Sequence, residues 1–567
     1  MEKNEFSVKG IAGQGPRLRP AYVNWPLAGA AILFIVVFLL TRLPIFLYYR
    51  GVLLNLDSSR YFMIVDQINK GFWPSLSIRT LGYPLFLKVI YAIFSTSAAV
   101  AMVQHAITLA SRLFFIWAMA RSFPRRPLVP LAVAAALAAH AAIAEHVLLD
   151  SSYMTDSLFV SLIILTLGFL ILGLARGKKA LFIAASLSAA GTVLVRPAGL
   201  FLVLILALAA VFMARNRLGW ARIIAVAAPC AAVLLMQMTY NALTIGTFSL
   251  STYSDFAMIS LTSTFLEPDA AYGRTANQAI ARCRSVFQEK DRRTMSTSWD
   301  PKAIRFVFRR YYERNRIRIA NVFLAAEPTE EYNLYLKWRP LWRRMALDAL
   351  RKHPVFALKY ISSNLYRVFW TNPGRQADLY RALHQNRLDL GNRLEMVSSC
   401  GVPDSLFNRC YNTRQYSSTL SPSAFARSML PEAYDKDGSP RSAESPPPGP
   451  GDEPIAPVWE RLHRSLIPVH SFLFRNPLWT LALLAAWVFS LARLLRTGLR
   501  HRGAFTLFLL TTSAVTYGVQ VAILAFPYLR YTYCLEFVYY LSPFLWPIAL
   551  GSGDGDAEPL ARKEEAK

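Results

Sequence analysis

Charged residues are scarce in this chain, and cysteine is rarer still. Only 17% of its 567 residues are charged, whereas 54% are hydrophobic and the mean hydropathy is +0.30. This balance excludes a string of soluble domains and a disordered chain. The five cysteines are too few for a disulfide-dense secreted scaffold, and no Cys-x-x-Cys or Cys/His cluster suggests a zinc or iron–sulfur site.

Several catalytic signatures are missing as well. The sequence has no Gly-x-x-x-x-Gly-Lys-Ser/Thr loop, no dinucleotide-binding fingerprint, no Gly-x-Ser-x-Gly elbow and no His-Glu-x-x-His motif. Nucleotide hydrolysis, hydride transfer, serine hydrolysis and zinc proteolysis therefore lack their usual signals. The net charge of +27 favours a partner that carries phosphate. Nucleic acid is disfavoured as that partner, because the Arg-rich segments follow membrane topology or lie in a loop predicted to face outward.

Long apolar runs are abundant, and they predict an all-α polytopic membrane protein with about ten transmembrane helices. A span needs about 20 mainly apolar residues. The predicted spans are 27–47, 98–120, 128–149, 157–175, 179–195, 198–214, 222–240, 477–497, 503–526 and 534–551. We expect an integral, multi-pass protein of a plasma membrane or bacterial inner membrane, with its first span retained.

The basic residues orient these spans. Lys and Arg cluster in the short loops that follow the second, fourth, sixth and eighth spans, which predicts that these loops and both termini face the cytoplasm. The apolar stretch Tyr83–Ser95 has only thirteen residues, so we expect a helix at the outer interface rather than a crossing. The two long loops, 48–97 and 241–475, then lie on the outer face, where chemistry is expected.

This topology predicts five regions. They are a cytoplasmic segment 1–26, a transmembrane module 27–240, an outer domain 241–475 of helical or mixed structure, C-terminal spans 476–551 and a cytoplasmic tail 552–567. Within the outer domain, the Pro-rich linker 439–457 is too extended to pack. Cys400 and Cys410 either form a local disulfide or remain two free thiols.

The loop 48–97 contains the most informative stretch. Asp57 follows the first predicted span by ten residues, which places a carboxylate on the outer side. The apolar residues after Ser58 recur at helical spacing, so we expect an amphipathic helix on the bilayer with Asp57 at its N-terminus. Asp57 is then either a helix cap or a catalytic carboxylate.

Further motifs follow in a fixed order. After Asp57 come Tyr61, Gly71, Arg79-x-x-Gly82-Tyr83-Pro84, Thr155–Asp156, Arg196–Pro197, His353–Pro354 and Arg530–Tyr531. These motifs, in this order and all predicted to lie on the outer side of the membrane, resemble those of the class C glycosyltransferase (GT-C) superfamily. Members of this superfamily include protein mannosyltransferases and lipid A aminoarabinose transferases. The resemblance covers most of 27–240 and, more thinly, 340–370 and 526–551. One departure is Val65 followed by Asp66, where such sequences usually carry a small residue; we interpret Asp66 as a solvated face residue.

The resemblance implies an inverting enzyme that transfers a sugar from a polyprenyl-phosphate donor to a glycan, lipid or protein on the outer face. By this resemblance Asp57 is the general base and Asp156 the second carboxylate. Positive charge must hold the leaving phosphate, and this role falls to Arg79, Arg196 and Arg530. The substrate pocket would be lined by Arg60, Tyr61 and Tyr83.

Simpler roles compete for these residues. Asp156 could cap a helix together with Thr155, the arginines could snorkel at the interface, and the tyrosines could be membrane anchors. Carboxylates on the outer edge could hold a divalent cation, but no metal site is predicted. The alternative for the whole chain is a transporter or lipid flippase. Such proteins often have repeated halves and helices broken at mid-membrane, whereas here the Arg and acidic motifs lie mostly at span ends and no half repeats the other.

Overall fold

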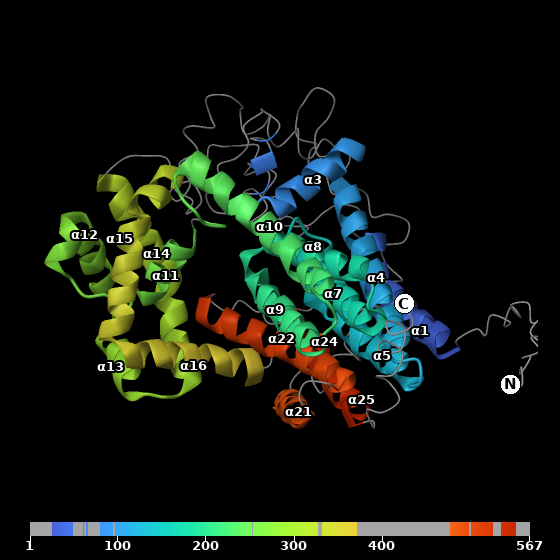
Figure 1. Cartoon of the computed structure of the whole chain (residues 1–567). Helices are drawn as coiled ribbons and strands as arrows, with labels where there is room; N and C mark the ends of the chain where they lie inside the picture. The colour runs from blue at the N-terminus through green and yellow to red at the C-terminus, as the bar shows by residue number, and fades with distance from the viewer. Residues whose placement is uncertain are drawn as a thin grey trace, which may run out of the picture.

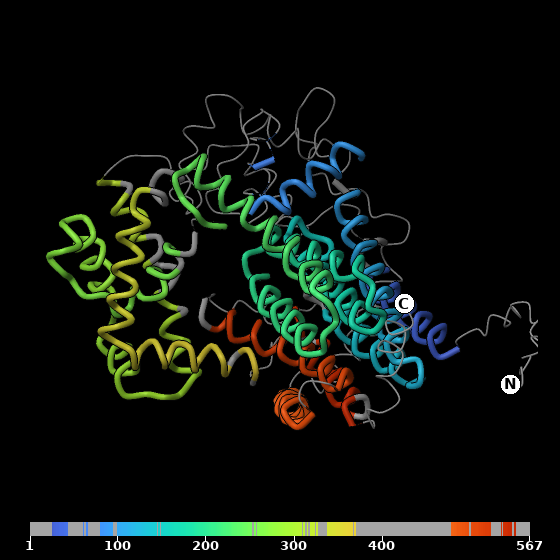
Figure 2. The backbone as a smooth tube through the Cα atoms, viewed as in Figure 1, coloured from blue at the N-terminus to red at the C-terminus, as the bar shows by residue number. Residues whose placement is uncertain are grey.

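The computed structural model describes residues 25–48, 61, 64, 65, 68, 80–94, 97–251, 253–326, 331–370, 477–497, 501–524 and 534–550. Every regular element in these ranges is a helix, and none is a strand (Figure 1). Most of the helices form a bundle. A second group, α11–α16, lies to the left of that bundle in Figure 2. The chain therefore has the predicted all-α architecture.

Seven of the described helical segments are long and apolar enough to cross a membrane. They are α1 (Trp25–Tyr48), α4 (Ser97–Ser122), α7 (Thr155–Arg176), η1 (Pro197–Leu200) continued by α9 (Phe201–Arg215), α10 (Trp220–Ile245), α21 (Pro477–Arg496) and α22 (Arg502–Leu524). These segments make the chain an integral membrane protein of the polytopic class.

The other three predicted spans are shorter or broken. The first is split into α5 (Leu128–Ala141) and α6 (Ala144–Asp150), the second is α8 (Lys179–Val195), and the third consists of α24 (Glu536–Leu541), η5 (Ser542–Leu545) and α25 (Trp546–Leu550). Proline explains the end of α8, since the residue before a proline avoids the helical region. Arg196, which precedes Pro197, is accordingly extended with φ −157° and ψ 125°.

One end of the bundle carries the Arg-rich short loops. Arg222, at the start of α10, donates from Nε to the carbonyl of Gly177 at 2.9 Å. Arg502, at the start of α22, donates to the carbonyls of Ala175 and Ser122 at 3.4 Å. These bonds join the ends of α4, α7, α10 and α22. We propose that this end faces the cytoplasm, because basic residues favour that side.

The opposite end carries α3 (Gly82–Ile93), the short apolar helix that the sequence predicts. A Cβ atom on Gly82 would lie 2.6–2.7 Å from the backbone of Leu194 and Val195, at the end of α8. Only glycine permits this approach of α3 to the α8 backbone. The Gly-Tyr-Pro motif therefore holds α3 against α8, which ends one residue before Arg196.

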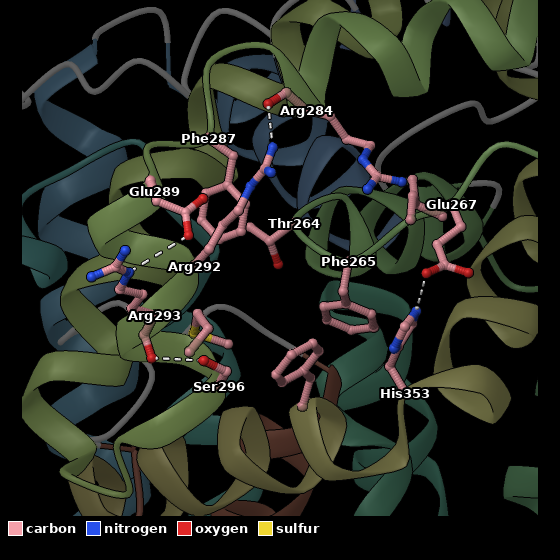
Figure 3. A pocket seen from close by; sticks show the side chains of 13 residues that line it. Thr264, Phe265, Glu267, Arg284, Phe287, Glu289, Arg292, Arg293, Ser296 and His353 are labelled. Carbon is pink, nitrogen blue, oxygen red and sulfur yellow. Dashed lines mark hydrogen bonds and ion pairs between the residues drawn. The ribbon is translucent and has the colours of Figure 1, made fainter.

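The second group of helices has a hydrophobic core of its own. It consists of α11 (Tyr253–Thr262), η2 (Ala270–Tyr272), α12 (Gly273–Arg284), α13 (Glu289–Thr297), α14 (Pro301–Ala326), α15 (Glu331–Lys352) and α16 (Pro354–Trp370). Trp342 of α15 is fully buried in this core, between Phe256 and Phe323. A pocket lies within the group, lined by residues that include Phe265, Arg292 and His353 (Figure 3).

Helix α16 joins this group to the bundle, and Figure 1 shows it extending toward α22. Asn364 donates from Nδ2 to the carbonyl of Ala522 at 3.0 Å, and both residues are buried. One turn further along α16, the ring of Phe369 packs against Gly518 of α22. The C-terminal half of α16 is therefore part of the bundle, while its N-terminal half borders the pocket.

Replacing Gly82 by alanine should destabilise the protein by about 1–3 kcal/mol, because the new methyl group meets backbone atoms that cannot move aside. Thermal unfolding of the purified protein in detergent measures the effect. Gly29→Ala in α1 is the matched control, since a Cβ there meets nothing within 4 Å. Equal midpoints for Gly82→Ala and wild type would contradict the close packing of α3 on α8.

Candidate functional site

A buried ion pair lies at the α3 end of the bundle. Arg196 donates from Nη1 to Oδ1 of Asp156 at 2.5 Å. Asp156 is 1% exposed and Arg196 is 8% exposed. The other carboxylate oxygen of Asp156, Oδ2, is buried without a hydrogen-bond partner among the described residues. A buried carboxylate oxygen without a hydrogen bond destabilises the fold. We therefore regard Oδ2 as the atom of this site that would accept a hydrogen bond from a ligand.

Local structure explains why these two side chains meet. Asp156 lies in the first turn of α7, where the helix dipole favours an anion. It does not cap that helix, because the N-cap is Met154 and no side chain bonds there. Arg196 has an extended backbone and follows the last residue of α8, so it is not part of that helix. Two motifs that are 40 residues apart in the sequence are thus paired in space.

Tyr83 connects this pair to a second polar cluster. Its ring packs edge-on against Tyr61, with centroids 4.9 Å apart, and its hydroxyl donates to Oε1 of Gln104 at 2.8 Å. Burial, together with the nearby Tyr61, Tyr91 and Asp156, raises the pKa of Tyr83 well above its usual value. The phenol therefore stays protonated and acts as a hydrogen-bond donor.

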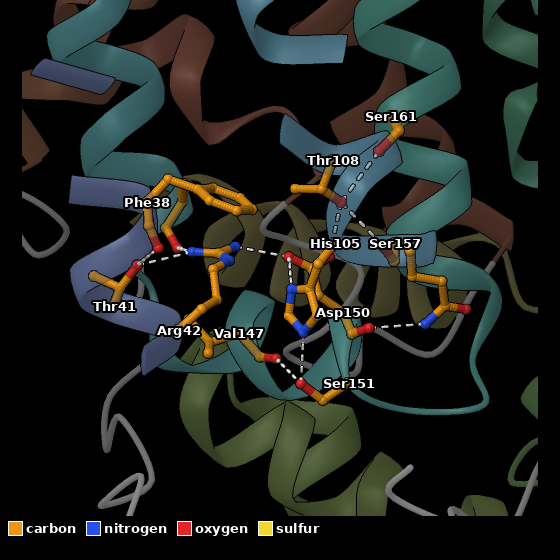
Figure 4. A network of polar contacts seen from close by, with 12 residues as sticks. Phe38, Thr41, Arg42, His105, Thr108, Val147, Asp150, Ser151, Ser157 and Ser161 are labelled. Carbon is orange, nitrogen blue, oxygen red and sulfur yellow. Dashed lines mark hydrogen bonds and ion pairs between the residues drawn. The ribbon is translucent and has the colours of Figure 1, made fainter. Parts of the chain in front are cut away.

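The second cluster is centred on Asp150 (Figure 4). Arg42 of α1 donates from Nη2 to Oδ2 of Asp150 at 2.7 Å, and Thr108 of α4 donates to Oδ1 at 3.1 Å. His105 Nδ1 lies 3.9 Å from Oδ2. The guanidinium of Arg42 balances the buried negative charge of Asp150. Asp150 is therefore an ionised anchor that fixes α1 against α4 and α6.

Gln104 links the two clusters. Its Nε2 donates to the carbonyls of Asp150 and Ser152, each at 2.9 Å, while its Oε1 accepts from Tyr83. The segment between α6 and α7 is thereby held against α4 and α3. Asp156 begins the next helix, so this bridge also fixes the position of the candidate carboxylate.

The sequence leaves open whether carboxylates on the outer edge bind a divalent cation, and the second cluster contains one of these carboxylates, Asp150. Both carboxylate oxygens of Asp150 already accept hydrogen bonds. Within the described ranges, no group of three or more His, Cys, Asp or Glu side chains has the arrangement of a metal site. Asp156 differs from Asp150 in having one buried oxygen, Oδ2, without a hydrogen-bond partner among the described residues.

The structure describes some of the predicted site residues and not others. Asp156, Arg196, Tyr61 and Tyr83 lie at the same end of the bundle. The predicted residues Asp57, Arg60, Arg79 and Arg530 lie outside the described residues, as do the linker 439–457 and the pair Cys400 and Cys410.

The predicted amphipathic helix after Asp57 is partly described. Tyr61, Ile64, Val65 and Ile68 are helical and buried, at the spacing of one helix face. Tyr61 and Val65 belong to the core of the bundle, whereas Ile64 and Ile68 pack with Leu81. This face therefore contacts protein.

Sequence reasoning missed the roles of Arg42, His105 and Gln104. A signal was present for the two basic residues, because ionisable side chains within apolar spans are rare and normally paired. Arg42 lies inside the first span and His105 inside the second. Their shared partner, Asp150, is 108 residues from Arg42 along the chain, so the pairing itself leaves no local pattern.

No family model and no curated protein sequence matches the chain. Two solved structures are similar to it. The archaeal oligosaccharyltransferase AglB from Archaeoglobus fulgidus, in complex with an inhibitory peptide and a dolichol-phosphate, has 12% identity and a TM-score of 0.34, over 92% of this chain and 50% of that one. ArnT from Cupriavidus metallidurans, bound to undecaprenyl phosphate, has 12% identity and a TM-score of 0.28, over 92% of this chain and 77% of that one.

This chain spans about half the length of AglB. With TM-scores this low the likeness is weak, and the assignment of function rests on the residues of this chain.

Removing Arg42 should test the anchoring role of the second cluster. Arg42→Met leaves the Asp150 carboxylate buried without its cation, and the loss of stability should be about 3–5 kcal/mol. The double variant Arg42→Met/Asp150→Asn is the matched control, because it removes both charges and should recover part of the loss. Thermal unfolding in detergent compares them. A double variant less stable than Arg42→Met alone would contradict the anchoring role.

Proposed function

We propose that the chain is a membrane glycosyltransferase that moves a sugar from a polyprenyl-phosphate donor to a hydroxyl of a glycan, lipid or protein on the outer face. The observation that supports this most is the buried Asp156 carboxylate, which Arg196 holds through one oxygen and whose other oxygen has no hydrogen-bond partner among the described residues. A carboxylate beside a guanidinium suits a reaction that needs an acceptor for a hydroxyl proton and a cation for a phosphate.

The proposed reaction is a single displacement. The acceptor oxygen attacks the anomeric carbon from the face opposite the phosphate and forms the new glycosidic bond. The bond between that carbon and the phosphate oxygen breaks, and polyprenyl phosphate leaves with the electron pair. The acceptor proton passes to Asp57, the general base. The configuration at the anomeric carbon is inverted.

The described residues take supporting roles in this proposal. Asp156 accepts a hydrogen bond from the acceptor hydroxyl at Oδ2 and orients it. Arg196 binds the donor phosphate together with Arg79 and Arg530, because a guanidinium can hold a phosphate through two parallel hydrogen bonds. Tyr83, Tyr61 and Arg60 form the wall of the substrate pocket. The lipid chain enters laterally between helices of the bundle.

Replacing Asp57 by asparagine should abolish transfer or reduce its rate by about 10²–10⁴-fold, since asparagine cannot accept the proton. The purified protein is assayed with a panel of radiolabelled polyprenyl-phosphate sugars and with lipid, glycan and peptide extracts as acceptors. Asp66→Asn is the matched control, because Asp66 is predicted to be a solvated residue of the same helix. It should keep full activity.

Two results would contradict the catalytic assignment. Full activity of Asp57→Asn would remove Asp57 from the reaction. Failure of folded wild-type protein to turn over any donor with the whole acceptor panel would favour the transporter or flippase alternative, and movement of labelled lipid across proteoliposomes would then establish it.

Arg196→Lys tests the phosphate role separately. Lysine keeps the charge beside Asp156 but loses the planar fork, so the KM for the donor should rise about tenfold or more while kcat changes less. Arg222→Lys, at the opposite end of the bundle, is the control and should leave both constants unchanged. A larger fall in kcat than rise in KM would show that Arg196 does not act by holding the donor.

A further inference from the structure

A separate cavity lies within the α11–α16 group, where the chain after α11 meets α13 and the start of α16 (Figure 3). Its volume is about 270 Å³. Lys359 of α16 is buried and donates from Nζ to the carbonyls of Met295 and Ser296, each at 2.8 Å. This contact fixes the C-terminal end of α13 against α16, so the walls of the cavity are held by tertiary contacts.

One wall of the cavity is aromatic. The ring centroid of Phe265 lies 6.0 Å from that of Phe356 and 6.1 Å from that of His353, and the rings of His353 and Phe356 are stacked 5.7 Å apart. Flat apolar faces of this kind suit the C–H faces of a compact ring. His353 belongs to the His-Pro motif of the sequence, to which the reaction proposed above assigns no role.

The opposite wall is cationic. Arg292 donates from Nη2 to the carbonyl of Arg284 at 3.3 Å and lies over the ring of Phe287 at 5.7 Å, so its guanidinium is already positioned. Arg293 is paired with Glu289 at 3.7 Å. By contrast, neither Arg284 nor Arg292 forms an ion pair with a carboxylate in the described part of the chain.

The remaining acidic residue of the cavity, Glu267, forms no ion pair with Arg284 or Arg292 among the described residues. Oε1 of Glu267 lies 3.3 Å from Nε2 of His353, at the aromatic wall, and Figure 3 shows this contact on the side away from Arg292. Arg292 and Arg284 therefore each keep a guanidinium without a carboxylate partner in the described part of the chain, and Figure 3 shows the Arg284 side chain extending toward the side of Glu267.

Thr264 supplies a buried polar atom between the two walls. It is 8% exposed, and its Oγ1 has no hydrogen-bond partner among the described residues. Figure 3 shows this hydroxyl pointing into the cavity. A buried hydroxyl without a partner is unfavourable, so a ligand that carries a hydroxyl group would satisfy it.

We propose that this cavity binds one anionic sugar residue. The sugar ring packs on Phe265 and Phe356, a ring hydroxyl bonds to Oγ1 of Thr264, and a carboxylate or phosphate on the sugar binds Arg284 and Arg292. The volume lies just below the range of about 300–1,000 Å³ for small-molecule sites, which suits one sugar residue rather than a long glycan.

The cavity lies at the opposite end of α16 from the contact of this helix with the bundle. Phe356 and Phe369 are thirteen residues apart on α16, which corresponds to about 20 Å of helix. The cavity therefore holds a distant part of a substrate rather than the reacting atoms. We assign the bound sugar to the acceptor, and this assignment rests on the proposed function, whereas the binding itself does not.

Binding is tested by calorimetry on the full-length protein in detergent, with glucuronic acid and glucose 6-phosphate as probes and glucose as the neutral comparison. At least one anionic probe should bind about tenfold or more tightly than glucose, and the two arms distinguish a carboxylate from a phosphate. Arg292→Gln and Arg284→Gln should each remove most of this preference, and Thr264→Val should weaken all binding. Arg282→Gln, on the same helix α12 but outside the cavity, should change nothing.

Absence of binding to both anionic probes, or equal affinity for glucose, would overturn the proposal. It would also fail if Arg282→Gln reduced binding as much as Arg292→Gln. Because calorimetry needs no turnover, binding by a protein that transfers no sugar would uphold the cavity while the proposed function fails. In an active enzyme, Arg292→Gln should raise the KM for an anionic acceptor and leave kcat unchanged; an unchanged KM would overturn the acceptor assignment.

Discussion

Charge buried within an apolar helix bundle must be paired, and this constraint organises one end of the molecule. Each buried ion costs several kcal/mol of desolvation, which only a close partner with good hydrogen bonds offsets. Two pairs meet this requirement, Arg42 with Asp150 and Arg196 with Asp156. The first fixes α1 against α6, and the second fixes the end of α8 against the start of α7. The positions of these four helix segments therefore depend on electrostatic pairing as well as on apolar packing.

The two ion pairs differ in how completely their carboxylates are hydrogen-bonded. Asp150 accepts hydrogen bonds at both oxygens, from Arg42 at Oδ2 and from Thr108 at Oδ1. Asp156 is bonded at Oδ1 alone, and its buried Oδ2 is unsatisfied among the described residues. A buried carboxylate that is hydrogen-bonded at both oxygens holds its helices together, whereas a buried carboxylate oxygen without a partner can still accept a hydrogen bond from a ligand. We therefore interpret the first pair as an anchor and the second as part of the reaction site.

Hydropathy and local motifs predict a large part of this fold. The seven long spans follow from apolar length alone, and the end of α8 follows from Pro197. The split of the last predicted span into three short helices was not predicted, because hydropathy measures apolar content and is insensitive to backbone breaks. The motif that contains Gly82 suggests a family resemblance but does not explain why glycine is needed there. The contact with the backbone of Leu194 explains it.

The candidate site was only partly predictable for a related reason. Asp156 and Arg196 can be selected from their motifs at span ends, but their pairing is a tertiary contact. The cavity in the α11–α16 group was not predicted at all. Its residues come from segments as far apart as Thr264 and Phe356, and Arg292 alone looks like any exposed helix residue. Only the fold shows that an aromatic wall, a cationic wall and an unsatisfied hydroxyl face one another.

A cryo-electron microscopy structure of the protein with added polyprenyl phosphate would show where the donor phosphate binds. Our account predicts that the phosphate lies within hydrogen-bonding distance of Arg196, beside Asp156, with the lipid chain running along the bundle. A phosphate bound only at the opposite end, beside Arg222 and Arg502, would contradict it, because the lipid would then be held by the basic loops and not by the candidate site.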